Sequence, residues 1–203
     1  MGLEMSYQAV PLEAHLFELL ARQPELSDPL EFVPGWFRDG YRANGSRPWP
    51  EADKLWKYFC QIEQENPGLG KRNCYLSKSW DRLHYLLSAT RREEQSTEQD
   101  VLMDKAVRGS IQVANLRASQ GNPIMWVHPN EVQLAATVLE SMSAQDLRKL
   151  YDAQKMWNIG IYKSWRDEAE EEWWPLSADL FTHFRAFYLE VARHHEGVFV
   201  ILS

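Results

Sequence analysis

The chain has 203 residues and a formal net charge of −7, with 44% hydrophobic and 25% charged residues. These proportions are those of an ordinary globular protein, and the length suits one domain with its own core. The negative charge argues against nucleic-acid binding, which requires many Lys and Arg side chains to contact the phosphates. The nine tryptophans are a high count, and Trp is favoured in large cores and at protein interfaces.

The sequence pattern contains no sign of secretion or of a membrane span. The first residues lack a basic start followed by an apolar run, and no apolar stretch approaches the roughly 20 residues of a membrane-spanning helix. Only two cysteines occur, Cys60 and Cys74. Cys60 lies among apolar residues, so we expect a buried, reduced thiol. We therefore expect a cytoplasmic protein that does not enter a membrane.

The first third of the chain contains two predicted helices around a long loop. Residues 3–10 alternate roughly between apolar and polar and predict a strand. Pro11 and the leucine spacing that follows predict an amphipathic helix over residues 12–23. Residues 24–50 are rich in proline, glycine and aromatic residues, which predicts an ordered insertion that crosses the surface as a loop. Residues 51–65 predict a second helix.

The remaining elements follow from hydrophobic periodicity. Helices are predicted at 80–87, 101–109, 131–142, 144–157 and 176–195, with Asn130 as the cap of the third, and residues 91–99 as an exposed loop. Strands are predicted at 124–127 and 198–202, and residues 111–116 fit either a strand or a loop. The whole chain, residues 1–203, is thus predicted to be one α+β domain. We expect the two terminal strands to share a small sheet, with the last helix packed across it.

Asp81 and His84 form the best candidate for catalysis. They are three positions apart on a predicted helix, where a carboxylate can orient an imidazole and make it a general base. Tyr162 and His128, which precedes a proline at a strand-to-helix turn, are further candidates. The alternative interpretation is structural, with Asp81 at a helix start and His84 in a packed boundary. No phosphate loop, nucleophile motif or metal-ligand spacing occurs, so the sequence predicts no cofactor and no metal.

A second candidate site combines acids with tryptophans. Residues 167–172 are strongly acidic and are flanked by aromatic residues, a combination that suits contact with a basic protein partner. The candidate binding residues are Trp80, Trp165, Glu170, Glu171, Glu172, Trp173 and Trp174. The structural alternative is a solvated loop whose tryptophans enter the core.

Three kinds of function remain open. The preferred hypothesis is a non-enzymatic protein that acts by binding another protein, for which an immunity- or antitoxin-like inhibitor of a basic toxin is one concrete form. The alternative is a small cytoplasmic enzyme that uses the Asp81 and His84 pair on a small molecule. A structural subunit of a homodimer is the third hypothesis.

Several short patterns, taken in order, resemble the YfbM-like family of bacterial proteins, grouped as domain of unknown function 1877. They are Met1-Gly2, Trp80-Asp81-x-Leu83-His84-x-x-Leu87, Ala106-x-x-Gly109, Leu134-Ala135-Ala136, Leu147-Arg148-Lys149-x-Tyr151, Ile161-Tyr162 with Trp165, and Gly197 before an aliphatic last strand. The family pattern often has proline after Ile-Tyr, where this chain has Lys163. The resemblance implies an α+β fold and a bacterial, cytoplasmic origin. It implies no activity, so it assigns no catalytic residue.

Overall fold

The computed structural model describes residues 3–12, 15–41, 50–118 and 121–203, apart from the side chains of residues 114–116. Met1 and Gly2, which belong to the family pattern, lie outside the described residues. At the centre is an antiparallel sheet with the strand order β2-β1-β5-β4-β3. Its strands are β1 (Met5–Val10), β2 (Asn73–Ser77), β3 (Ile111–Arg117), β4 (Pro123–Val127) and β5 (Gly197–Leu202).

The first and last strands lie next to each other within the sheet. Met5 pairs with Leu202 and Val10 with Gly197, so the two strands are joined along their whole length. Every residue of β1 is buried, because β1 has a strand on each side and helices over both faces. The prediction of an α+β domain whose sheet contains both terminal strands is confirmed, and residues 111–117 form a strand.

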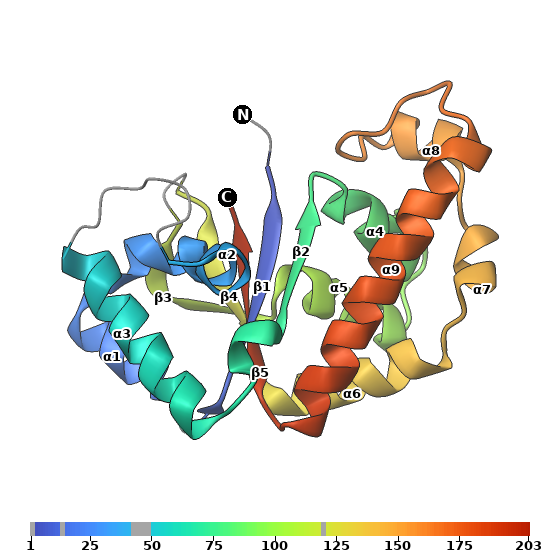
Figure 1. Cartoon of the computed structure of the whole chain (residues 1–203). Helices are drawn as coiled ribbons and strands as arrows, with labels where there is room; N and C mark the ends of the chain where they lie inside the picture. Colours follow the sequence, from blue (N-terminus) through green and yellow to red (C-terminus); the bar gives the residue numbers. More distant parts are fainter. Residues whose placement is uncertain (1–2, 13–14, 42–49, 119–120) are drawn as a thin grey trace.

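Two layers of helices enclose the sheet (Figure 1). One layer contains α1 (Leu16–Arg22), the 3-10 helix η2 (Pro24–Phe32), α2 (Val33–Asp39) and α3 (Pro50–Glu65). The other contains α4 (Trp80–Leu87), α5 (Glu98–Arg108), α6 (Pro129–Ser141), α7 (Ala144–Arg148), α8 (Ala153–Asn158) and α9 (Glu170–Arg193). A short 3-10 helix, η3 (Leu69–Lys71), precedes β2.

Side chains along each strand point alternately toward one helical layer and toward the other. Successive strand residues point to opposite faces of a sheet, so Phe199 packs toward α1, where its ring centroid is 5.4 Å from that of Phe17. Tyr7 faces the other layer, with its ring centroid 5.4 Å from that of Phe184 on α9. The Tyr188 hydroxyl of α9 also donates to the Ala106 carbonyl at 2.6 Å. The expectation that the last helix packs across the sheet is confirmed.

The predicted loop at 24–50 is helical over residues 24–39. Its prolines occupy the first turns of η2 and α2, where a missing amide hydrogen costs no helical hydrogen bond, and Pro29 lies inside η2. Leu26, Leu30 and Val33 are buried at helical spacing against the core. The loop prediction is wrong for residues 24–39, because proline at the first turn of a helix is compatible with helical structure. Residues 42–49 lie outside the described residues.

Other boundaries differ from the predictions for local reasons. The predicted helix at 144–157 is two helices, because Asp152 leaves the helical conformation and caps α8 by accepting a hydrogen bond from the Lys155 amide at 2.9 Å. α1 begins at Leu16 rather than at residue 12. β2 was not predicted, since its five residues give too short a pattern. Cys60, expected to be buried, is half-buried, and Cys74 is the buried thiol.

Candidate functional site

Helix α4 carries its charged residues inside the protein. Asp81 is 4% exposed, and its carboxylate accepts hydrogen bonds from Arg91 Nε at 2.7 Å and from Arg91 Nη2 at 2.8 Å. The Tyr162 amide donates a third hydrogen bond at 2.8 Å. Burial alone raises the pKa of Asp81, but these hydrogen bonds outweigh burial and hold the pKa well below its usual range. Asp81 is therefore a charged anchor between α4 and two loops.

His84 lies one turn further along α4 and is 2% exposed. Its Nε2 is 2.8 Å from Asp104 Oδ1, and Arg108 Nη2 donates to Asp104 Oδ2 at 3.1 Å. Its Nδ1 is 3.9 Å from Asp81 Oδ1, too far for a hydrogen bond, and has no other partner among the described residues. The structure brings Asp81 and His84 close together, but each makes its hydrogen bonds with a different residue.

The other two candidate catalytic residues have structural contacts of their own. His128 caps α6, because its Nδ1 accepts a hydrogen bond from the Asn130 amide at 3.2 Å. The prediction that Asn130 caps this helix is therefore wrong. The Tyr162 hydroxyl accepts from the Leu3 amide at 3.1 Å. In the described part of the chain, no hydrogen bond joins His128 to α4 or to Tyr162. The four side chains are thus engaged separately.

Arg82 on α4 makes the contact that sequence reasoning missed. Its Nη2 donates to Glu168 Oε2 at 2.9 Å and to the Lys163 carbonyl at 3.0 Å, and the two paired side chains are 2% and 1% exposed. The guanidinium carbon also lies 4.8 Å from the centre of the Trp173 ring, a cation–π contact. Arg82 therefore fastens both the 159–169 segment and the start of α9 to α4.

Glu168 organises the segment around it. Its other carboxylate oxygen accepts from the Tyr151 hydroxyl at 2.6 Å, and its Oε2 also accepts from the Trp165 amide at 3.2 Å. Burial raises the pKa of Tyr151 most, and the hydrogen bond to Glu168 raises it further. Because Glu168 receives both the Arg82 guanidinium and the Trp165 amide, the position of Trp165 depends on this buried ion pair.

A groove opens on the outer side of this ion pair, which we call the tryptophan groove. It is an open hollow of about 650 Å³, lined by Trp157, Trp165, Arg166, Asp167, Glu168, Ala169, Glu172 and Trp173. Trp157 is 50% exposed and Trp165 45% exposed. The Trp165 and Trp173 rings are stacked at a tilt of 34°, with centroids 5.0 Å apart. Exposed indoles gathered in a hollow are typical of a site that contacts another molecule.

The loop interpretation of the acidic run, residues 167–172, is right for its first half and wrong for its second half, because α9 begins at Glu170. Glu170, Glu171 and Glu172 form the first turn of α9, where negative charge is stabilised by the helix dipole. Glu170 pairs with Arg148 at 2.7 Å, whereas Glu172 and Asp167 line the groove. The acids of the run therefore lie in three settings: Glu168 in a buried ion pair, Glu170 in a surface ion pair, and Asp167 and Glu172 in the groove.

Two of the predicted binding tryptophans lie elsewhere. Trp174 is half-buried, and its ring meets Tyr151 edge-on with centroids 6.1 Å apart. Trp80 lines a different cavity of about 330 Å³, beside Met5, Met125 and other apolar residues of the sheet. Conversely, Trp157 lines the groove but was not singled out in the sequence, because it lies outside the acidic run.

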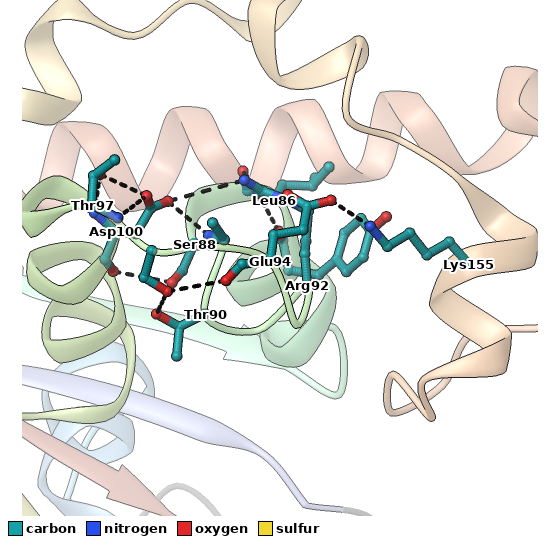
Figure 2. A network of polar contacts seen from close by, with 11 residues as sticks. Leu86, Ser88, Thr90, Arg92, Glu94, Thr97, Asp100 and Lys155 are labelled. Carbon is teal, nitrogen blue, oxygen red and sulfur yellow. Dashed lines mark hydrogen bonds and ion pairs between the residues drawn. The ribbon is translucent and has the colours of Figure 1, made fainter.

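A polar network supports the α8 side of the groove (Figure 2). Arg92 Nη1 donates to the Tyr85 and Leu86 carbonyls at the end of α4, at 2.9 and 3.3 Å. Arg92 Nε donates to Glu94 at 2.9 Å, and Glu94 in turn pairs with Lys155 of α8. This chain of contacts ties α8, which carries Trp157, to the same helix that holds the other side of the groove.

The described residues also bear on two other classes of site. Among those residues, no three His, Cys, Asp or Glu side chains are grouped so that they could hold a metal ion. None of the described helices is long and apolar enough to cross a membrane.

The fold and groove define a single α+β domain with an aromatic, acidic hollow beside a buried ion pair. The sequence model of the family described as domain of unknown function (DUF1877) matches residues 1–201, so the chain belongs to this family. The crystal structure of YfbM from Escherichia coli, a protein of unknown function, shares the fold, with a TM-score of 0.55 and 16% identity over 98% of this chain and 99% of that one. No curated protein matches.

Proposed function

We propose that this protein acts by binding another protein, and that the tryptophan groove receives a basic segment of that partner. The observation that carries the proposal is the pair of half-exposed indoles, Trp157 and Trp165, in a hollow that Asp167 and Glu172 also line. Large aromatic side chains are the residues that contribute most to protein interfaces, and unpaired acids attract a basic surface.

The charge of the whole chain supports the same partner. At −7 the protein attracts basic molecules over distances of about 10 Å at moderate salt. One concrete form of this function is an immunity- or antitoxin-like inhibitor of a basic toxin inside a bacterial cytoplasm. In that form the groove contacts the toxin, and the buried ion pairs beneath it keep the groove in shape before the toxin arrives.

The enzyme alternative has less support in the geometry. The Asp81 carboxylate already accepts hydrogen bonds from Arg91 and the Tyr162 amide, and His84 is buried beside Asp104. Neither Asp81 nor His84 lines the tryptophan groove or the cavity beside Trp80. A general base must come within hydrogen-bond reach of a substrate proton, and binding at the groove requires no such access.

Co-purification tests the proposed function. The tagged full-length protein is expressed in its native cell at its natural level, together with the variants Trp165→Ala, Glu172→Lys and Glu140→Lys. Glu140 is an exposed acid on α6 outside the groove and serves as the matched control. We expect a stoichiometric, positively charged partner with the wild type and with Glu140→Lys, and its loss with the two groove variants. A partner retained by all variants, or none at all, contradicts the proposal.

A further inference from the structure

We propose that the tryptophan groove recognises an arginine side chain, which stacks on Trp165 and donates hydrogen bonds to Asp167 or Glu172. This inference rests on the proposed function and adds the chemistry by which the partner is held. Three observations support it: the same cluster already binds an arginine from inside, two of its acids form no ion pair with a described residue, and two of its indoles are exposed.

The inner side of the cluster already binds a guanidinium. Arg82 lies over the Trp173 ring, 4.8 Å from its centre, while its Nη2 donates to the Glu168 carboxylate at 2.9 Å. This is the arrangement of a recognised arginine, with the planar cation on an aromatic face and a carboxylate at its edge. Trp165 is stacked on Trp173 and is 45% exposed, so it offers an indole surface to a second guanidinium from outside.

The acids around the cluster are sorted by their partners. Glu168 is paired with Arg82, and Glu170 is paired with Arg148. Glu172 and Asp167 line the groove, and neither forms an ion pair with a described residue. Of the carboxylates in this stretch that form no ion pair with a described residue, Asp167 and Glu172 line the hollow, whereas the exposed Glu171 does not.

One cation of the chain itself also lines the groove. Arg166 Nε donates to Gln154 Oε1 of α8 at 3.2 Å, which holds this side chain against α8. Its charge opposes an incoming cation in part. The two exposed acids outnumber it, and the field in the groove remains attractive to a positive ligand.

Arginine fits this site better than lysine for physical reasons. A guanidinium is planar and weakly hydrated, so it can lie on an indole and still donate hydrogen bonds in its plane. A lysine ammonium is compact and strongly hydrated, and it gains less from an exposed aromatic face. A groove built from three tryptophans and two free acids therefore discriminates by shape as well as by charge.

The test titrates the full-length, ¹⁵N-labelled protein with three capped tripeptides of the form Gly-X-Gly, where X is arginine, lysine or citrulline. Citrulline keeps the shape of arginine without its charge. The readout is the shift of the Trp157 and Trp165 indole N–H resonances. We expect the arginine peptide to bind at least about threefold more tightly than the lysine peptide, and the citrulline peptide to cause no saturable shift.

Matched variants locate the binding. Trp165→Ala and Glu172→Gln are each expected to weaken arginine-peptide binding at least about fivefold. Leu134→Ala, which removes a 58% exposed side chain of α6, and Glu140→Gln are expected to leave it unchanged. Backbone amide spectra confirm that each variant is folded, and because Glu172→Gln is nearly isosteric, it stays informative if Trp165→Ala disturbs the groove.

The outcomes separate this inference from the proposed function. Equal binding of arginine and lysine peptides, or no shift at the two indoles, overturns arginine recognition. If a basic partner nevertheless co-purifies and is lost with Trp165→Ala, the proposed function stands while the arginine inference fails. If the arginine peptide binds as expected but no partner co-purifies, the groove chemistry stands and the proposed function fails.

Discussion

Arg82 and Glu168 are 86 positions apart in the sequence, yet their side chains meet at 2.9 Å in the interior. One belongs to α4 and the other to the segment before α9, so the pair closes a long stretch of chain onto a single helix. The outer neighbours of this ion pair, Trp165 and Trp173, are two of the three indoles that line the groove. The groove is thus a surface feature whose shape depends on a buried contact.

The first prediction concerns the strength of this ion pair. Removing one partner of a buried pair leaves an uncompensated charge, which costs about 3–5 kcal/mol. Arg82→Met and Glu168→Gln are each expected to lower the free energy of unfolding by about this amount, measured by urea denaturation. Arg148→Met serves as the control, because its pair with Glu170 is 50% and 41% exposed and is worth about 0–1 kcal/mol.

The double variant Arg82→Met/Glu168→Met sharpens this prediction. Replacing both charges by apolar groups leaves no buried ion unpaired, so the double variant is expected to be less destabilised than the sum of Arg82→Met and Glu168→Met measured singly. Additive effects would show that the two residues contribute independently and that the pair does not join α4 to the groove.

The second prediction concerns pH and Asp81. Burial raises the pKa of Asp81, but the hydrogen bonds from Arg91 and the Tyr162 amide hold it well below the ordinary value of 3.8. A carboxyl with a lowered pKa in the folded state contributes stability that is present above the unfolded pKa and is lost as the pH falls through the folded one. The contribution of Asp81 is therefore complete at neutral pH and declines progressively below about pH 4.

The variant Asp81→Asn tests this expected pH dependence of stability. At pH 7 the variant is expected to be less stable than the wild type by about 3–5 kcal/mol, since Arg91 loses its buried partner. The difference in the free energy of unfolding should shrink as the pH is lowered from 5 toward 2, because the wild type then protonates Asp81 as well. Arg91→Gln is expected to make the free energy of unfolding depend less on pH over the same acid range, because it removes the partner that lowers the pKa of Asp81. Parallel curves for wild type and Asp81→Asn between these pH values contradict the assignment.

The sequence is sufficient for the two terminal strands and for α4, whose apolar residues recur at short range, but not for β2, whose five residues give too short a pattern. Residues 5–10 and 197–202 pair along their length, and the leucines of α4 recur at helical spacing. It is not sufficient for residues 24–39, where proline at a first helical turn looks like proline in a loop. The difference between the two is set by burial of Leu26 and Leu30 against the core, which no local pattern reveals.

The candidate site could be predicted from the sequence only in part, because its contacts also join residues that are distant in the chain. The acids and tryptophans of residues 165–174 were visible as a cluster, but their sorting into paired and free groups depends on Arg82 and Arg148, both distant in sequence. The close pair Asp81 and His84 had the spacing of an acid–base dyad. Its actual hydrogen-bond partners, Arg91 and Asp104, come from other segments, so spacing alone could not separate catalysis from structure.

The third prediction concerns the two thiols. Cys74 is 6% exposed, and burial raises its pKa to about 12, while the half-buried Cys60 has a pKa raised less by burial. The thiolate is the reactive form, so both exposure and pKa favour Cys60. With a disulfide reagent at pH 8, one thiol per folded chain is expected to react, and the second only after unfolding. Cys60→Ser should remove the first reaction; if it removes the second instead, the assignment is wrong.

The fourth prediction asks whether the groove tryptophans serve stability or contact. Trp165→Ala loses a tilted ring contact worth about 0.5–1.5 kcal/mol in addition to its area burial. Because Trp165 and Trp157 are 45% and 50% exposed, each buries only part of its surface, and both variants are expected to cost less than a core substitution. Phe184→Ala, in contrast, empties a fully buried position and is expected to cost about 3–5 kcal/mol. Urea denaturation of the three variants measures these differences. If Trp165→Ala were as costly as Phe184→Ala, Trp165 would belong to the core, and the reason to regard it as a contact residue would be lost. A small loss means that the chain keeps a large apolar ring at its surface with little benefit to folding, as expected of a residue retained for binding.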